Sequence, residues 1–187
     1  MWNLPNILTL LRIALIPVFI VVYYSTSWEW HNLAAAAIFG LAAATDWVDG
    51  FVARKYNLIT AFGAFLDPVA DKLIVVAAMV VLLEVHATPW FSIPAIVIIG
   101  REIVISALRE WMAEMGYRGT VAVATIGKVK TWVQMVAIIV LLLAKPEQQW
   151  LNLLGFVAIY VAAGLTLWSM VYYIRQALPQ LRAENGK

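Results

Sequence analysis

The chain has 187 residues, of which 64% are hydrophobic and 13% charged, and its formal net charge is +2. A soluble globular domain has about 25% charged residues, so this composition excludes a chain whose whole surface faces water. The absence of cysteine excludes disulfides, thiolate zinc sites and iron–sulfur clusters. Because the basic residues form no dense stripe, we do not expect nucleic acid as a partner.

Apolar runs of membrane-spanning length follow one another along the whole chain. A transmembrane helix needs about 20 residues. The runs predict six helices, at Ile7–Tyr24, Leu33–Phe51, Ala61–Val85, Phe91–Trp111, Val121–Ala144 and Trp150–Ile174. No repeat or linker divides them, so we expect one all-α integral membrane domain over residues 1–187, built as a six-transmembrane-helix bundle.

The connections between these runs alternate in charge. Arg54, Lys55 and Arg118 lie in connections on one side, together with the basic tail, whereas Lys145 is the only basic residue expected on the other side. Cytoplasmic loops of membrane proteins are rich in Lys and Arg, so both termini are predicted to be cytoplasmic. The opposite edge carries tryptophans, as an interfacial aromatic belt does: Trp28, Trp30, Trp90 and Trp150.

Four carboxylates, Asp46, Asp49, Asp67 and Asp71, lie at the expected inner ends of the second and third helices. Each pair is three or four residues apart and shares a helix face, and the short turn between the helices predicts antiparallel neighbours. An ionised Asp inside a bilayer costs about 2.5–3.5 kcal/mol. Oxygen ligands without His or Cys favour Mg²⁺, Mn²⁺ or Ca²⁺, and four carboxylates could bridge two ions.

Two alternative interpretations of these acids remain open. They could form ion pairs with Arg54, Lys55 and Lys72 or lie in headgroup water, although partial pairing would leave other carboxylates desolvated. They could also form the transport site of a divalent-cation transporter. Transporters often have inverted repeats and sites near the membrane midplane, whereas this sequence has its acids at one face and shows no repeat.

The acids belong to a longer pattern that resembles a known enzyme family. Asp46, Asp49, Gly50, Ala53 and Arg54 are followed, after eight intervening residues, by Gly63, Asp67 and Asp71. This pattern resembles the complete signature of the CDP-alcohol phosphatidyltransferases. The segments 3–12, 101–113 and 127–131 are similar to the bacterial phosphatidylglycerophosphate synthase branch of that family.

The resemblance implies an enzyme dependent on Mg²⁺ or Mn²⁺ that moves a phosphatidyl group from CDP-diacylglycerol to an alcohol and releases CMP. It implies that Asp46, Asp49 and Asp67 are metal ligands and that Asp71 is a further ligand or the base for the hydroxyl proton. It also implies a homodimer in the bacterial inner membrane, with the active site facing the cytoplasm.

The donor, CDP-diacylglycerol, is expected to contact Gly50, Ala53, Arg54 and Gly63. Gly50 and Ala53 are small enough to leave room for a nucleotide, and the Arg54 guanidinium suits the donor phosphates. Arg54 could instead be an anchor at the inner interface, and Gly63 could instead serve helix packing.

A second basic group points to a phosphorylated acceptor. Arg101 lies deep in the fourth run, Arg109 follows it, and Lys128 and Lys130 begin the fifth helix. Arg gives bidentate contacts to phosphate and Lys gives a point charge, so these residues predict a cytoplasmic pocket for sn-glycerol 3-phosphate. Alternatively, Arg101 pairs with Glu102, and the two lysines only set topology. A sister transferase with inositol phosphate, serine or phosphatidylglycerol as acceptor also remains open.

Overall fold

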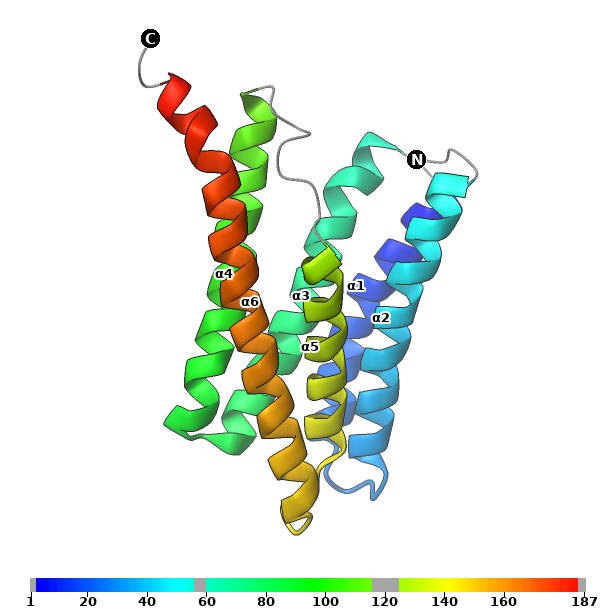
Figure 1. The fold of residues 1–187 in the computed structure, drawn as a ribbon. Coiled ribbons are helices and arrows are strands. Elements are labelled where there is room, and N and C mark those ends of the chain that lie inside the picture. Colours follow the sequence, from blue (N-terminus) through cyan, green and yellow to red (C-terminus); the bar gives the residue numbers. More distant parts are fainter. Residues whose placement is uncertain (1–2, 56–59, 116–124, 185–187) are drawn as a thin grey trace. The chain divides into compact units, whose positions relative to one another are not determined.

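The computed structural model describes residues 3–55, 60–115 and 125–184. Regular structure within these ranges is entirely helical (Figure 1). The helices are α1 (Leu4–Tyr24), α2 (His31–Lys55), α3 (Ala61–His86), α4 (Pro89–Glu114), α5 (Thr125–Leu143) and α6 (Gln149–Glu184). The prediction of an all-α fold is therefore confirmed for the described ranges. Each predicted apolar run corresponds to one helix, and the first four residues of the fifth run, 121–124, lie outside those ranges.

The end of α6 differs most from the prediction. The apolar run ends at Ile174, whereas the helix continues to Glu184. The added segment is polar, so hydropathy cannot mark it as part of a span. It is nevertheless rich in Gln, Leu, Ala and Arg, which are good helix formers, and the helix therefore continues beyond the apolar stretch.

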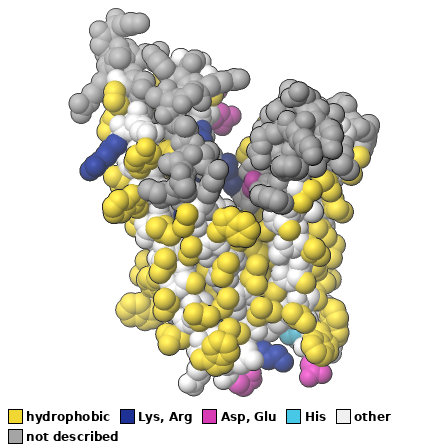
Figure 2. Space-filling model, turned by 45° about the vertical axis from the view of Figure 1, so that its right-hand side comes forward, with side chains coloured by type: hydrophobic (Ala, Val, Ile, Leu, Met, Phe, Trp, Pro, Cys, Tyr) yellow, Lys and Arg dark blue, Asp and Glu magenta, His cyan; other side chains and the backbone are white. Residues whose placement is uncertain are grey.

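Three helices contain described stretches that are long and apolar enough to cross a membrane: Pro5–Tyr24, Pro89–Glu114 and Gln149–Gln176. The described parts of α2 and α5 contribute shorter apolar segments, and charged side chains shorten the apolar stretch of α3. Hydrophobic side chains are spread over the described part of the face drawn in Figure 2, as on a surface that contacts lipid. These features are those of a membrane protein; six spans and cytoplasmic termini stay predictions.

Contacts divide the chain into two compact units. Unit 1 comprises Met1–His86 and Ile138–Gly155, and unit 2 comprises Ala87–Ala137 and Phe156–Lys187. The helices α5 and α6 therefore each contribute to both units.

In unit 1, α1 packs against both α2 and α3, and more extensively than those two helices pack against each other. The rings of Phe19 and Phe39 lie 6.5 Å apart between centroids and connect α1 with α2 in the buried core. The helices α2 and α3 also contact each other, as the short connection between them predicts.

The first turn of α1 is fixed by its own sequence. The Asn3 side chain accepts a hydrogen bond from the Asn6 backbone N–H at 3.3 Å, and Pro5 occupies the first turn. Asn is a favoured N-cap and Pro is preorganised for a helix start. The start of α1 lies at the same end of unit 1 as the end of α2 and the start of α3 (Figure 1), which is the end that bears the acids.

In unit 2, α4 packs against α6. The Tyr160 hydroxyl on α6 donates to the Trp90 carbonyl at 2.8 Å, and the rings of Phe91 and Phe156 meet edge to face at 5.9 Å. Ile98 and Ile105, further along α4, are also buried. These two residues flank the charged positions of α4, Arg101 and Glu102.

Candidate functional site

Two of the predicted metal ligands, Asp67 and Asp71, lie one turn apart on α3 and are held by α1. The Thr9 hydroxyl donates to Asp67 Oδ1 at 2.6 Å, and the Arg12 guanidinium forms a salt bridge with Asp71 Oδ1. Arg12 is 1% exposed, whereas the Asp71 side chain is 40% exposed. The arrangement therefore orients both carboxylates while leaving Asp71 accessible to a ligand.

These contacts belong to a polar stripe on α1 that consists of Asn6, Thr9 and Arg12, all buried. Asn6 and Thr60 exchange side-chain hydrogen bonds of 3.1 Å, and the Thr60 hydroxyl accepts from the Gly63 N–H at 3.0 Å. The role of this stripe was not predicted, because the segment 3–12 was recognised only by its resemblance to the family. The available signal was three polar residues at a spacing of three within an otherwise apolar helix.

Gly63 is buried at the contact between α1 and α3. A Cβ atom at this position would lie 2.5 Å from Asn6 Oδ1 and 3.2 Å from Thr60 Oγ1. A side chain here would therefore displace the Asn6 amide, which supports the helix-packing interpretation of this glycine. A contact between Gly63 and the donor stays a prediction.

The other predicted donor and metal residues lie in the C-terminal part of α2, and their side chains are outside the described residues: Asp46, Asp49, Gly50, Ala53 and Arg54. Among the side chains that are described, no three His, Cys, Asp or Glu residues come together as a metal site. Asp67 and Asp71 supply only carboxylate oxygens, which are the donors that Mg²⁺ prefers. These two residues thus fit part of a site for a hard divalent cation.

Arg12 of α1 is a counter-ion of Asp71. It lies 59 residues away in sequence and comes close only through the packing of α1 on α3. The alternative pairing of the acids with Arg54 and Lys55 lies outside the described side chains and stays open.

Unit 2 contains a second charged group, formed by Arg101, Glu102, Lys130 and Arg109 around Tyr173, which we call the basic cluster. Glu102 Oε1 accepts hydrogen bonds from Arg101 at 3.0 Å and from Lys130 Nζ. Arg101 also donates to Ser169 Oγ at 3.2 Å. Arg101 and Lys130 are 7% and 2% exposed, so both are buried cations that share one carboxylate oxygen.

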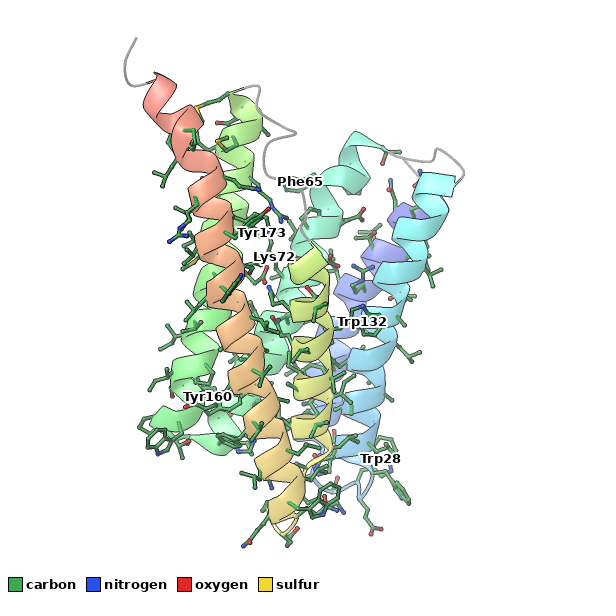
Figure 3. The ribbon with its side chains drawn as sticks, in the orientation of Figure 1. Trp28, Phe65, Lys72, Trp132, Tyr160 and Tyr173 are labelled. Atoms are coloured by element: carbon green, nitrogen blue, oxygen red, sulfur yellow. The ribbon has the colours of Figure 1, made fainter. Side chains whose placement is uncertain are left out.

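Tyr173 connects Arg109 to the same cluster. Its ring, which projects from α6 (Figure 3), has the Arg109 guanidinium 5.2 Å and the Arg101 guanidinium 5.7 Å from its centroid. Aromatic faces attract cations at such distances. The structure thus brings together three of the four residues predicted for the acceptor pocket. The fourth, Lys128, has its side chain outside the described residues.

The pairing of Arg101 with Glu102 is the one that the alternative interpretation of Arg101 anticipated. It does not remove the capacity of the cluster for an anion, because Arg101, Arg109 and Lys130 outnumber this one carboxylate. The acceptor pocket stays a prediction that this geometry supports.

A family model for CDP-alcohol phosphatidyltransferase matches residues 2–168, a stretch that runs through both units. The chain belongs to the CDP-alcohol phosphatidyltransferase family. The resemblance inferred from the acidic signature is therefore confirmed.

Near full-length relatives within this family agree with one another. The chain is 50% identical over 186 residues to a protein of Pseudomonas fluorescens, covering 99% of this chain and 95% of the relative. It is 53% identical over 180 residues to a protein of Escherichia coli strain K12 and to one of Shigella flexneri, covering 96% of this chain and 97% of each. All three relatives are named CDP-diacylglycerol–glycerol-3-phosphate 3-phosphatidyltransferase.

Proposed function

We propose that this chain transfers the phosphatidyl group of CDP-diacylglycerol to sn-glycerol 3-phosphate, giving phosphatidylglycerophosphate and CMP. The observation that carries the proposal is 50–53% identity, over almost the whole chain, to relatives named for this reaction. The carboxylates of α3 and the basic cluster of unit 2 supply side chains of the two kinds that the reaction requires.

The chemistry assigned to the acids is a phosphoryl displacement. A hydroxyl oxygen of the acceptor attacks the lipid phosphorus of the donor, and the bond from that phosphorus to the CMP oxygen breaks. Asp71 accepts the hydroxyl proton, for which its partly exposed carboxylate is suited. Asp67, fixed by Thr9, keeps one orientation, so the site needs little reorganisation during the reaction.

The proposed metal ligands are Asp46, Asp49, Asp67 and Asp71, with Mg²⁺ or Mn²⁺ as the cation and two ions as the expected number. When bound, such ions supply positive charge against the donor pyrophosphate. On the protein side, Arg54 would contact the donor phosphates, and Gly50, Ala53 and Gly63 would leave space for the nucleotide.

The acceptor phosphate is assigned to the basic cluster, with Lys128 as its fourth basic residue. The fork of Arg101 can bind two phosphate oxygens at once, while Lys130 acts as a point charge. An acceptor without a phosphate, such as serine, would gain nothing from these buried cations. This difference favours glycerol 3-phosphate over the acceptors of sister transferases.

We place the enzyme in a bacterial inner membrane as a single domain with six spans, both termini and the active site on the cytoplasmic side. The asymmetric distribution of basic residues supports this orientation. A homodimer, which family resemblance implies, is part of the same proposal.

An acceptor panel with purified protein and labelled CDP-diacylglycerol tests the proposal. CMP release should require Mg²⁺ or Mn²⁺ together with glycerol 3-phosphate, and should stay near background with free glycerol, serine or inositol phosphate. Equal turnover with serine would overturn the acceptor assignment while leaving the family intact. Full activity after treatment with a chelator would overturn the assignment of the metal.

A further inference from the structure

Glu102 is the carboxylate that the described structure places against two buried cations of the basic cluster. A single oxygen, Oε1, accepts from both Arg101 and Lys130. Both cations depend on this contact, because burial of an unpaired charge costs several kcal/mol. Glu102 thus occupies hydrogen-bond donors that an anionic ligand of this cluster would also use.

The cluster has further hydrogen-bonding capacity that its internal contacts do not use. Two buried donors of the cluster have no hydrogen-bond partner among the described residues: Arg101 Nε and the Tyr173 hydroxyl. Arg101 and Tyr173 are donors, and buried donors are normally satisfied. A ligand with several acceptor oxygens would satisfy more of these donors than the one oxygen of Glu102 does.

The charges of the cluster indicate which ligand can compete with Glu102. Arg101, Arg109 and Lys130 carry three positive charges, and Glu102 lowers the net charge of the cluster to two. A phosphate monoester carries up to two negative charges and three terminal oxygens, and it forms strong bidentate contacts with Arg. A carboxylate or another monoanion offers these cations no more than Glu102 already provides.

We propose that Glu102 is an internal counter-ion that the acceptor phosphate displaces from Arg101 and Lys130. This residue thereby weakens the binding of every anion but penalises monoanions most, so it determines specificity for a phosphorylated acceptor. The inference rests on the proposed function, because it assigns the acceptor phosphate to this cluster.

Glu102→Gln tests the displacement, since it removes the competing charge at nearly constant size. We expect the KM for glycerol 3-phosphate to fall about tenfold, which corresponds to about 1.4 kcal/mol, with no increase in kcat. A purely structural role for Glu102 predicts an unchanged or higher KM instead. An unchanged or higher KM in the folded variant would overturn the inference.

Ser169→Ala is the matched control. Ser169 contacts the same guanidinium as Glu102 but carries no charge. Its removal perturbs Arg101 without removing a competitor, so the KM should stay equal or rise. If Ser169→Ala lowered the KM as much as Glu102→Gln, the effect would come from loosening Arg101, and displacement would be rejected.

Ligand protection in thermal unfolding gives a second readout that does not depend on turnover. Inorganic phosphate should raise the unfolding midpoint of Glu102→Gln more than that of the wild type. Acetate, at matched ionic strength, should protect the variant but not the wild type. Equal protection of both proteins by each anion would contradict the specificity role.

Two further outcomes are assigned in advance. If Glu102→Gln does not fold, Glu102→Asp tests the displacement instead. Its shorter side chain keeps the charge but moves it away from both cations. A KM two- to threefold below wild type supports displacement, and an unchanged or higher KM overturns it.

If the wild type releases no CMP with glycerol 3-phosphate, the proposed function fails. If the wild type does release CMP and the variants show no decrease in KM, only this inference fails.

Discussion

The two units pair their charged side chains in opposite ways. In unit 1, the acids Asp67 and Asp71 receive their partners from α1, 58 and 59 residues away in sequence. In unit 2, the cation Arg101 pairs with the residue next to it, Glu102, which also contacts Lys130. The partner in unit 1 orients an accessible carboxylate, whereas the partner in unit 2 competes with the expected ligand. Charge pairing therefore orients the carboxylates of unit 1 for a ligand, whereas in unit 2 it reduces the affinity of the basic cluster for an anion.

The largest effect on turnover is expected for the acids of unit 1. Asp71→Asn should lower turnover by about 10³, because it replaces the proposed base, and a general base typically contributes a factor of 10²–10⁴. Binding of CDP-diacylglycerol should be largely retained, whereas Asp49→Asn should weaken metal-dependent donor binding as well as turnover. Single-turnover CMP release and equilibrium binding of labelled donor measure the two effects. Equal losses of donor binding in both variants would show that Asp71 is only a ligand.

Arg12→Met tests whether the long-range pair of unit 1 stabilises the fold. Breaking a buried pair typically costs 3–5 kcal/mol, and the 40% exposure of Asp71 reduces the penalty, so we expect a loss of about 2 kcal/mol. Thermal unfolding in detergent measures the loss. Arg12→Lys, which keeps the charge, should lose less. If Arg12→Met were as stable as the wild type, the pair of Arg12 and Asp71 would not stabilise the fold, and the two units would not differ in this respect.

The smallest effect is expected for Thr9→Val, which replaces the hydroxyl that orients Asp67 with a methyl group of similar size. The lost hydrogen bond to a carboxylate should cost about 1.5 kcal/mol. The Mg²⁺ concentration for half-maximal activity should rise several-fold, because Asp67 loses its fixed orientation. Thr9→Ser keeps the donor and should restore both values. Failure of the serine variant to do so would mean that packing of the methyl group matters instead.

The same comparison explains what could be predicted from the sequence. Apolar runs predicted the helices, and the adjacency of Arg101 and Glu102 allowed their pairing to be anticipated. The end of α6 could not be predicted from hydropathy, because helix propensity continues where apolar character stops. The contacts of Thr9 and Arg12 depend on the register of α1 against α3, which packing around residues such as Gly63 sets and no local pattern encodes.

The placement of these donors on the first helix also matters while the chain is being made. Protein synthesis proceeds from the N-terminus, so Thr9 and Arg12 leave the ribosome before Asp67 and Asp71. In the predicted six-span arrangement, two carboxylates that are costly to transfer into lipid therefore arrive when their partners already exist. The first helix thus provides polar partners for α3 before α3 is synthesised. A chain without α1 would have to insert the two carboxylates without these partners.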